Sequence, residues 1–181
     1  MRFERLYLSL LVFAAGGTSA SELADIPAYI EYSPTFSSSG QPNAEQLETL
    51  KNRGFQRIVY LAYTDQDQSL PFEDRLVKGL GMDFLHVPVD WHAPAKGDFY
   101  LYAGAVRQEP SKRTLLHCQV NYRASAFAFL YRVLHEDVAV AEAKRDLNRV
   151  WRPNETWRKL IFEVLEENDK SPYCEGCDWG G

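Results

Sequence analysis

The chain has 181 residues, of which 45% are hydrophobic, and a formal net charge of −5 at pH 7. This length and apolar content are typical of one globular domain with a buried core. The mildly acidic balance gives no basic surface for nucleic acid, and the 13% of aromatic residues argues against a disordered chain.

Residues 1–20 have the pattern of a secretory signal peptide. Arg2 and Arg5 give a positive start, residues 6–15 are apolar, and Thr18-Ser19-Ala20 offers small residues before a cut after Ala20. The apolar run is shorter than the ~20 residues that span a bilayer, which favours cleavage over an uncleaved anchor. The sequence therefore predicts an exported protein, secreted or periplasmic, with no membrane attachment after cleavage.

The rest of the chain alternates between strand and helix patterns. Expected strands cover residues 24–32, 55–63, 84–89 and 113–116, and expected helices cover residues 44–53, 72–80, 99–107, 124–135, 137–148 and 155–166. Residues 33–39, with Pro34 and four serines, predict a loop. The alternation indicates right-handed crossovers and an α/β fold, with one mostly parallel sheet flanked by helices and a helical C-terminal third. One domain over residues 21–170 and an irregular tail over residues 171–181 follow.

Polar side chains mark where several helices begin. Asn43 is an expected N-cap with Gln46 three residues later, close to a capping box. Asp98, Asp137 and Asn154 are expected N-caps of three later helices. These caps predict the helix starts independently of the apolar periodicity.

A cysteine stands where a predicted strand passes into a predicted helix. Cys118 follows strand 113–116 and precedes helix 124–135. Backbone N–H groups in such a turn and the helix N-terminus together bind anions, and the same field stabilises a thiolate. Arg123 adds a planar set of donors for an oxyanion. This is the equipment of covalent phosphoryl transfer, and the alternative is an inert core cysteine.

The stretch resembles the active-site loop of the cysteine-dependent protein tyrosine and dual-specificity phosphatases. Their pattern is His-Cys, five residues, Arg, then Ser or Thr. Here His117, Cys118, Arg123 and Ser125 are present, but four residues separate Cys118 from Arg123. Without a gap, Ala124 falls on the arginine position, which favours an inactive anion-binding or partner-binding relative. Rhodanese sulfurtransferases have a cysteine loop of about this shorter size, so sulfur transfer is a further alternative.

An upstream pattern adds to this resemblance. Gly40-Gln41-Pro42 opens a helix, and a Gly-Phe turn at residues 54–55 leads into a buried strand. Together with the His-Cys loop, this is similar to the bacterial beta-lactamase-hydrolase-like phosphatases over residues 36–134. The resemblance implies a cysteine-phosphatase-like fold and a phosphatase that acts on phosphate monoesters, whether small molecules or phosphoproteins. It implies no metal and no organic cofactor.

The resemblance also implies catalytic roles. Cys118 is the expected nucleophile, and Arg123 is expected to bind the phosphoryl oxygens together with the loop residues Gln119, Val120, Asn121 and Tyr122. Asp90 is the expected general acid, because the family carries an aspartate on a loop about this far before the cysteine. Asp98 competes for that role, with weaker claims from Asp65 and Asp67. A surface arginine and a solvated loop acid are the alternatives for Arg123 and Asp90.

Supporting residues flank the nucleophile. His117 is expected to fix the loop by hydrogen bonding, or to be a buried structural histidine. Asn121 tolerates a left-handed backbone and is expected to shape the loop. Ser125 is expected to assist the leaving thiolate, or to be a simple helix N-terminal serine. Three further residues are candidates to line a substrate cleft: Tyr63, Trp91 and His92.

The tail contains the other two cysteines of the chain, Cys174 and Cys177. A structural zinc site needs about four ligands, and no second pair of Cys or His is near in sequence. A redox dithiol usually opens a helix beside a βαβ unit, whereas this pair lies in a tail. In an oxidising compartment a local disulfide is therefore the favoured interpretation. The oligomeric state stays open.

Overall fold

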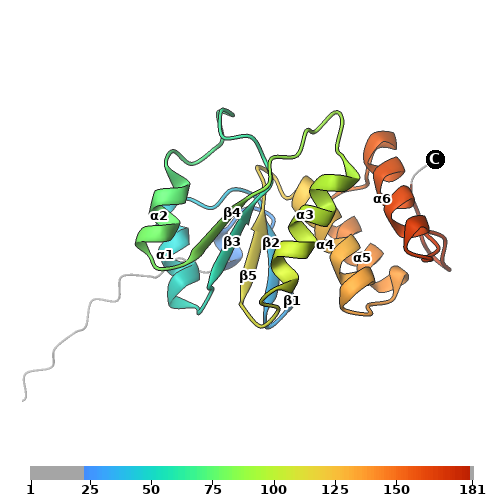
Figure 1. Ribbon diagram of the computed structural model, residues 1–181, viewed down its shortest axis with the longest axis horizontal. Helices are drawn as coiled ribbons and strands as arrows, with labels where there is room; N and C mark the ends of the chain where they lie inside the picture. Colours follow the sequence, from blue (N-terminus) through green and yellow to red (C-terminus); the bar gives the residue numbers. More distant parts are fainter. Residues whose placement is uncertain (1–22, 180–181) are drawn as a thin grey trace, which may run out of the picture.

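Five short strands form the central sheet of the computed structural model, which describes residues 23–179 (Figure 1). The strands are β1 (Ile30–Ser33), β2 (Phe36–Ser39), β3 (Arg57–Tyr60), β4 (Asp83–His86) and β5 (Thr114–His117). The helices are α1 (Ala44–Asn52), α2 (Glu73–Gly79), α3 (Lys96–Arg107), α4 (Tyr122–His135), α5 (Val140–Val150) and α6 (Glu155–Glu167). The expected signal peptide lies outside the described residues. The α/β class and the helical C-terminal third are confirmed.

The sheet is parallel except at one edge. Its strand order is β1-β2-β5-β3-β4, with β1 antiparallel to β2 and all other neighbours parallel. The last residues of the four parallel strands are in register: Ser39 opposite His117, His117 opposite Tyr60, and Tyr60 opposite His86. The loops after β3 and β4 project beyond this same end of the sheet (Figure 1). Binding sites in such sheets lie beyond the carboxyl ends of the strands.

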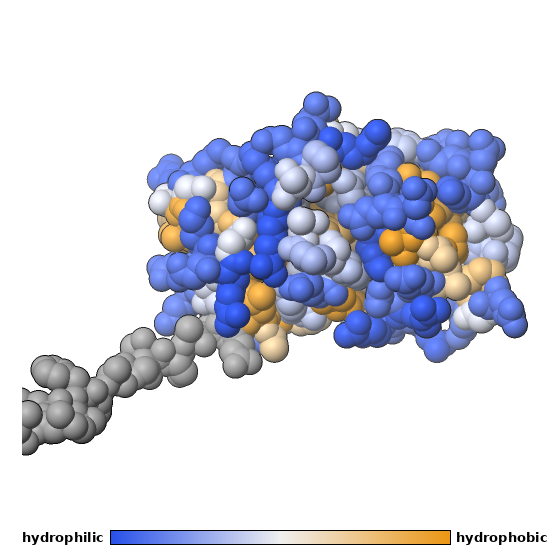
Figure 2. Space-filling model, turned by 90° about the horizontal axis from the view of Figure 1, so that it is seen from below, coloured by the Kyte–Doolittle hydropathy of each residue, from blue (hydrophilic) through white to orange (hydrophobic). Residues whose placement is uncertain are grey.

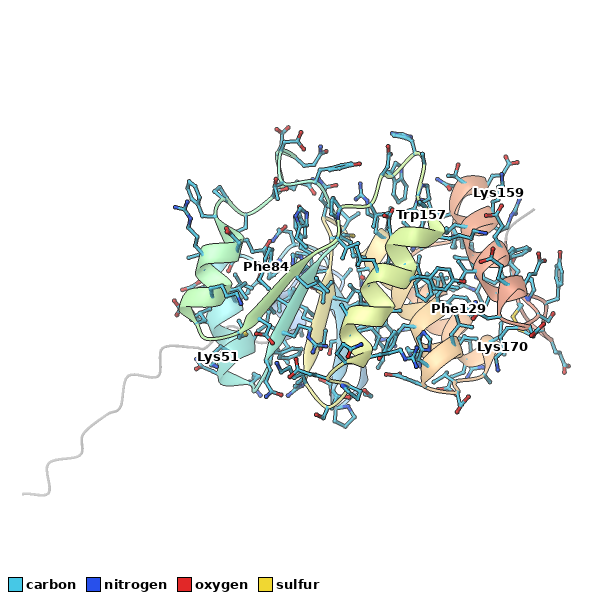
Figure 3. The ribbon with its side chains drawn as sticks, viewed as in Figure 1. Lys51, Phe84, Phe129, Trp157, Lys159 and Lys170 are labelled. Atoms are coloured by element: carbon cyan, nitrogen blue, oxygen red, sulfur yellow. A yellow bond between two sulfur atoms is a disulfide. The ribbon has the colours of Figure 1, made fainter. Side chains whose placement is uncertain are left out.

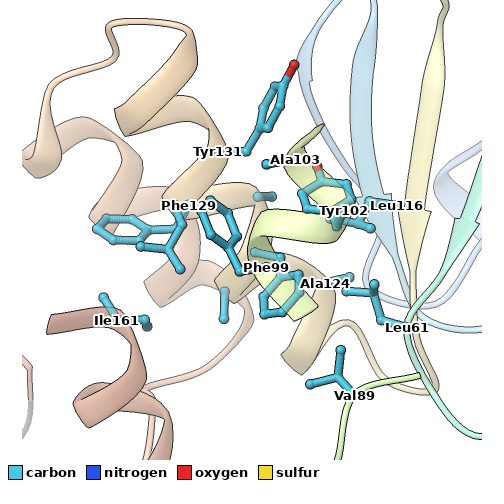
Figure 4. Close-up of a cluster of buried hydrophobic side chains, with 14 of the residues drawn as sticks. Leu61, Val89, Phe99, Tyr102, Ala103, Leu116, Ala124, Phe129, Tyr131 and Ile161 are labelled. Carbon is cyan, nitrogen blue, oxygen red and sulfur yellow. The ribbon is translucent and has the colours of Figure 1, made fainter. Parts of the chain in front are cut away.

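Both faces of the sheet are covered by helices. Helices α1 and α2 lie on one side and α3 to α6 on the other (Figure 1). Ile58 and Leu115 pack in the α1–α2 core, whereas the next residue of each strand, Val59 or Leu116, packs in the larger core. Figure 4 shows that larger core, with Leu116 of the sheet beside Tyr102 of α3. Side chains alternate between faces along a strand, so the apolar runs are buried on both sides, as the sequence predicts.

The loop expected over residues 33–39 is wrong for its second half, which forms β2. Phe36 is buried in the larger core, and the three serines that follow are completely buried. Their hydroxyls have partners: Ser37 bonds to Tyr29, Ser38 to Tyr32, and Ser39 to the Gly40 carbonyl. These bonds remove the cost of burying polar groups, so pairing with β5 overrides the low strand propensity of serine.

Two of the expected helix caps are confirmed and two are wrong. Asn43 and Gln46 form the reciprocal capping box of α1, and the Asn154 side chain accepts a hydrogen bond from Trp157 N at the start of α6. Asp98 instead lies inside the first turn of α3, where its Oδ2 accepts from Ala95 N at 3.4 Å. Asp137 has φ 52° in the turn before α5. Aspartate is common at N-caps, in first helical turns and in left-handed turns, so the residue type alone does not distinguish these three positions.

The C-terminal tail packs against the helical layer. Trp179 is buried against Phe129 of α4 and Phe162 of α6. Cys174 and Cys177 are joined by a disulfide. Lys144 Nζ lies 4.4 Å from the centre of the Trp179 ring, and burial lowers the pKa of this lysine to about 8.

The face drawn in Figure 2 is largely hydrophilic, and its hydrophobic side chains form separate patches. Among residues 23–179, no helix combines the length and apolarity that crossing a membrane requires.

Candidate active site

A pocket of about 520 Å³ lies where three loops meet at the carboxyl end of the sheet. Its lining residues are Tyr63, Gln66, Asp90, Trp91, His92, Gln119, Val120, Tyr122 and Arg123. They come from the loop after β3, the loop after β4, the β5–α4 connection and the first turn of α4. The loops that follow β3, β4 and β5 thus meet at one cleft, and Tyr63, Trp91 and His92 line it as expected. Gln66 was not foreseen, because nothing distinguishes it within a polar loop.

Cys118 lies at the base of the β5–α4 connection. It directly follows the last residue of β5, and its N–H donates to the Ser39 carbonyl at 3.3 Å. The residue is 0% exposed and packs in the larger core. Four of the five residues that follow it line the pocket, but Cys118 itself does not. Its role as nucleophile stays a prediction, and it requires the loop to expose the sulfur.

The backbone after Cys118 is held by its neighbours. Asn121 has φ 69°, the left-handed conformation that this residue type tolerates, and its Nδ2 donates to the Ala28 carbonyl at 2.7 Å. Gln41 N donates to the Gln119 carbonyl at 3.0 Å. A Cβ atom on Gly40 would lie 2.8 Å from that same carbonyl oxygen, so only glycine allows this approach. The Gly-Gln-Pro motif thus supports the loop directly.

Arg123 extends from the first turn of α4 into the pocket. Its Nε donates to the Val89 carbonyl at 3.1 Å, and its Nη1 reaches Gln119 Oε1 at 3.5 Å. The guanidinium lies 5.5 Å from the centre of the Trp91 ring, and the residue is 7% exposed. The alternative of a surface arginine is therefore wrong. Neither hydrogen bond uses Nη2, so this nitrogen can donate to a bound anion.

Asp90 lines the same pocket as Arg123. It is half-buried, and its Oδ1 accepts a hydrogen bond from His92 N at 2.8 Å. Of the competing acids, Asp65 and Asp67 are exposed, and neither they nor Asp98 line the pocket. The structure therefore brings together one carboxylate and one guanidinium beside the Cys118 loop.

An aromatic cluster forms one wall of the pocket. Tyr122 stacks on Trp151 with ring centroids 4.7 Å apart, and Trp91 lies 5.3 Å from Trp151. Trp157, labelled in Figure 3, donates from its indole to the Trp91 carbonyl at 3.0 Å. The hydroxyl of Ser125 accepts from the Trp151 indole at 3.1 Å and donates to the Tyr122 carbonyl at 3.2 Å. Its described bonds thus serve the aromatic cluster rather than the Cys118 sulfur.

His117, the last residue of β5, is completely buried. Its ring stacks on Tyr60 at 4.8 Å, and its Nε2 lies 3.2 Å from Glu73 Oε1. Burial raises the pKa of Tyr60, so its phenol stays neutral; it donates to the Tyr63 carbonyl at 3.1 Å. Glu73 was missed, because an acidic residue at a helix start reads as an ordinary dipole partner.

No group of three or more His, Cys, Asp or Glu that could hold a metal ion occurs within residues 23–179. Donor groups among the pocket-lining residues include the Arg123 guanidinium, His92 and the side-chain amides of Gln66 and Gln119. Such a set suits an oxyanion.

No protein-family model matches the chain, and no curated protein matches it. Among solved structures, it is similar to a protein from Shewanella putrefaciens CN-32 that is assigned as a phosphatase of family DUF442. The two are 33% identical over 81% of this chain and 96% of that chain, with a TM-score of 0.74.

Two further solved structures share the fold at low identity. PTPMT1, in complex with PI(5)P, is 13% identical over 78% of this chain and 96% of its own, with a TM-score of 0.67. The core catalytic domain of the PP-IP phosphatase SIW14 from S. cerevisiae is 14% identical over 78% of this chain and 93% of its own, with a TM-score of 0.60.

Proposed function

Because the chain belongs to the DUF442 family of phosphatase-like proteins, we propose that it hydrolyses phosphate monoesters at Cys118. One observation carries the proposal. The pocket places Arg123 and Asp90 beside the loop that contains the cysteine. The fold shared with PTPMT1 and SIW14 supports phosphorylated small molecules as a substrate class, alongside phosphoproteins.

The proposed reaction has two steps, formation of a phosphoryl-cysteine intermediate and its hydrolysis. The Cys118 thiolate attacks phosphorus, an S–P bond forms, and the P–O bond to the leaving group breaks. Asp90 gives its proton to the leaving oxygen and then takes a proton from the attacking water. Water cleaves the S–P bond and releases inorganic phosphate and the thiolate. Arg123 and the loop amides stabilise the phosphoryl oxygens throughout, once the loop has moved to expose the sulfur.

One observation favours a second candidate, an anion-binding module without turnover. Cys118 is completely buried, and the pocket is formed without it. In this case Arg123 and Gln119 would hold an oxyanion, and no covalent step would follow. The two candidates differ in turnover and agree in anion binding.

Replacing Asp90 with asparagine tests the proposed acid. Asparagine can still accept the His92 N–H bond, but it cannot donate a proton. We expect turnover of phenyl phosphate, which has a poor leaving group, to fall about a hundredfold. Turnover of 4-nitrophenyl phosphate should fall much less, because its leaving group departs without a proton. Steady-state kinetics with the two esters measure this difference.

Asp98→Asn is the matched control, because Asp98 lies on the adjoining helix start outside the pocket. We expect it to leave both rates unchanged. Equal losses for the two esters in Asp90→Asn would show that Asp90 is not the general acid.

A wild-type protein that hydrolyses neither ester but binds sulfate would support the anion-binding module. Sulfur transfer from thiosulfate to cyanide would instead support the sulfurtransferase alternative.

We also propose that the protein is exported. The charged start, the apolar run and the small residues before Ser21 support this. Expression in a bacterial host should give periplasmic protein whose first residue is Ser21, as read by terminal sequencing. Intact Met1 on protein in the cytosolic fraction would show that no cleavage occurs. Lengthening the side chain at the cut site with Ala20→Phe should block processing.

A further inference from the structure

Glu73 is a buried carboxylate in contact with the residue before Cys118. It is the first residue of α2, and its side chain is 4% exposed. Its Oε1 lies 3.2 Å from His117 Nε2 and accepts a hydrogen bond from Gln41 Nε2 at 3.0 Å. The two atoms are close enough for an ion pair, but their geometry is not that of a hydrogen bond.

Gln41 extends this contact to the other side of Cys118. Its side chain binds Glu73, and its backbone N–H donates to the Gln119 carbonyl at 3.0 Å. Glu73 therefore reaches both neighbours of Cys118, His117 directly and Gln119 through Gln41. The bare backbone of Gly40 allows Gln41 to come this close.

The arrangement is costly for the fold. Burying a carboxylate and an imidazole is unfavourable unless they are paired. Glu73 Oε2 and both ring nitrogens of His117 are buried without an aligned hydrogen-bond partner among the described residues. Phe72, directly before Glu73, has φ 57° and is 68% exposed. Strain and unsatisfied polar groups of this kind persist mainly where function requires them.

We propose that Glu73 is a positioning residue for the Cys118 loop. It orients the His117 ring through the 3.2 Å contact, and through Gln41 it fixes the Gln119 carbonyl. The backbone on both sides of Cys118 is then held in one conformation, much as hydrogen-bond partners fix the orientation of the reacting groups in other active sites. This inference rests on the proposed phosphatase function for its kinetic consequence, but the Glu73–His117 contact can be tested without it.

Glu73→Gln removes the charge and keeps the length and an acceptor for Gln41. We expect kcat for 4-nitrophenyl phosphate to fall about tenfold to a hundredfold while KM changes little, because the loop is misplaced but the pocket is intact. Asp74→Asn is the matched control. It removes a negative charge from the same first turn of α2, but its side chain is exposed. We expect its kcat to equal that of the wild type.

A double variant tests whether Glu73 acts through His117. If it does, adding Glu73→Gln to His117→Gln should cause little further loss of kcat, because residues that act as a unit are not additive. Losses that multiply would overturn the proposal, as would a loss in Asp74→Asn equal to that in Glu73→Gln.

Nitrogen-15 NMR of the histidine rings gives a readout that needs no turnover. The His117 signals are those missing in His117→Gln, and we expect them to shift in Glu73→Gln but not in Asp74→Asn. Unchanged His117 signals in Glu73→Gln would refute the positioning role whether or not the protein is a phosphatase. If the wild type shows no turnover but the His117 signals still shift in Glu73→Gln, only the proposed function is refuted.

Discussion

Cys118→Ser is expected to lower turnover of aryl phosphates by at least about a thousandfold, because an un-ionised hydroxyl replaces the nucleophilic thiolate. Binding of sulfate should survive, since Arg123 and the other polar side chains that line the pocket are unchanged and Cys118 is not among the lining residues. Steady-state kinetics and calorimetric titration with sulfate separate the two effects. In the wild type, rapid acid quenching should trap a phosphoryl group on the Cys118 peptide, detectable by mass spectrometry.

Cys118→Ala is the control for this substitution. Cys118 is completely buried, so serine places a hydroxyl in an apolar core at a cost of about 1–3 kcal/mol, whereas alanine removes only the sulfur. Both variants should be inactive, and alanine should have the higher melting temperature of the two. Turnover retained by the folded alanine variant would contradict the covalent mechanism and identify Cys118 as a core residue.

Arg123→Ala is expected to lower kcat/KM about a hundredfold to a thousandfold, the usual effect of removing a donor that stabilises developing oxyanion charge. Sulfate binding should weaken as well, because the fork of charged donors is lost. The Val89 carbonyl also loses its partner at 3.1 Å, so part of the stability is expected to go. Arg123→Lys keeps the charge and loses the planar fork, and it should recover binding better than kcat.

Arg132→Ala is the matched control for Arg123→Ala. Arg132 lies on the same helix, is 3% exposed, and donates to Asp146 at 2.7 Å away from the pocket lining. Losing this bond should lower the melting temperature but leave kcat/KM of the folded protein unchanged. If Arg132→Ala and Arg123→Ala reduced kcat/KM equally, the loss in Arg123→Ala would come from destabilisation, and Arg123 would have no role with the anion.

Local pattern was enough to predict most elements and the position of the Cys118 loop. The apolar runs in β3 and β5 are continuous and lack period-2 alternation, which is the pattern of a strand covered on both faces. The Asn43 and Asn154 caps act within one helical turn. Asn121 adopts the left-handed conformation for a reason internal to its own backbone. Such features depend on residues a few positions apart, and the sequence displays them directly.

Local sequence patterns do not predict side-chain partners that come from distant segments of the chain. Strand β2 was missed because its serines are stabilised by the hydroxyls of Tyr29 and Tyr32 and by pairing with β5. Glu73, in α2, was missed because its two contacts are distant in sequence. Gln41 lies 32 residues before it, and His117 is the last residue of β5. Neither set of partners is marked by any local spacing.

The sequence by itself determined that a cysteine stands between a buried strand and a helix, with an arginine in the first helical turn. Only the tertiary structure decided that Asp90 and Arg123 share a pocket, that Cys118 is closed off from it, and that Glu73 touches its neighbour. The physical reason is that backbone conformation follows from adjacent residues. The partners and the exposure of a buried polar side chain depend instead on which distant segments the crossovers bring to the same edge of the sheet.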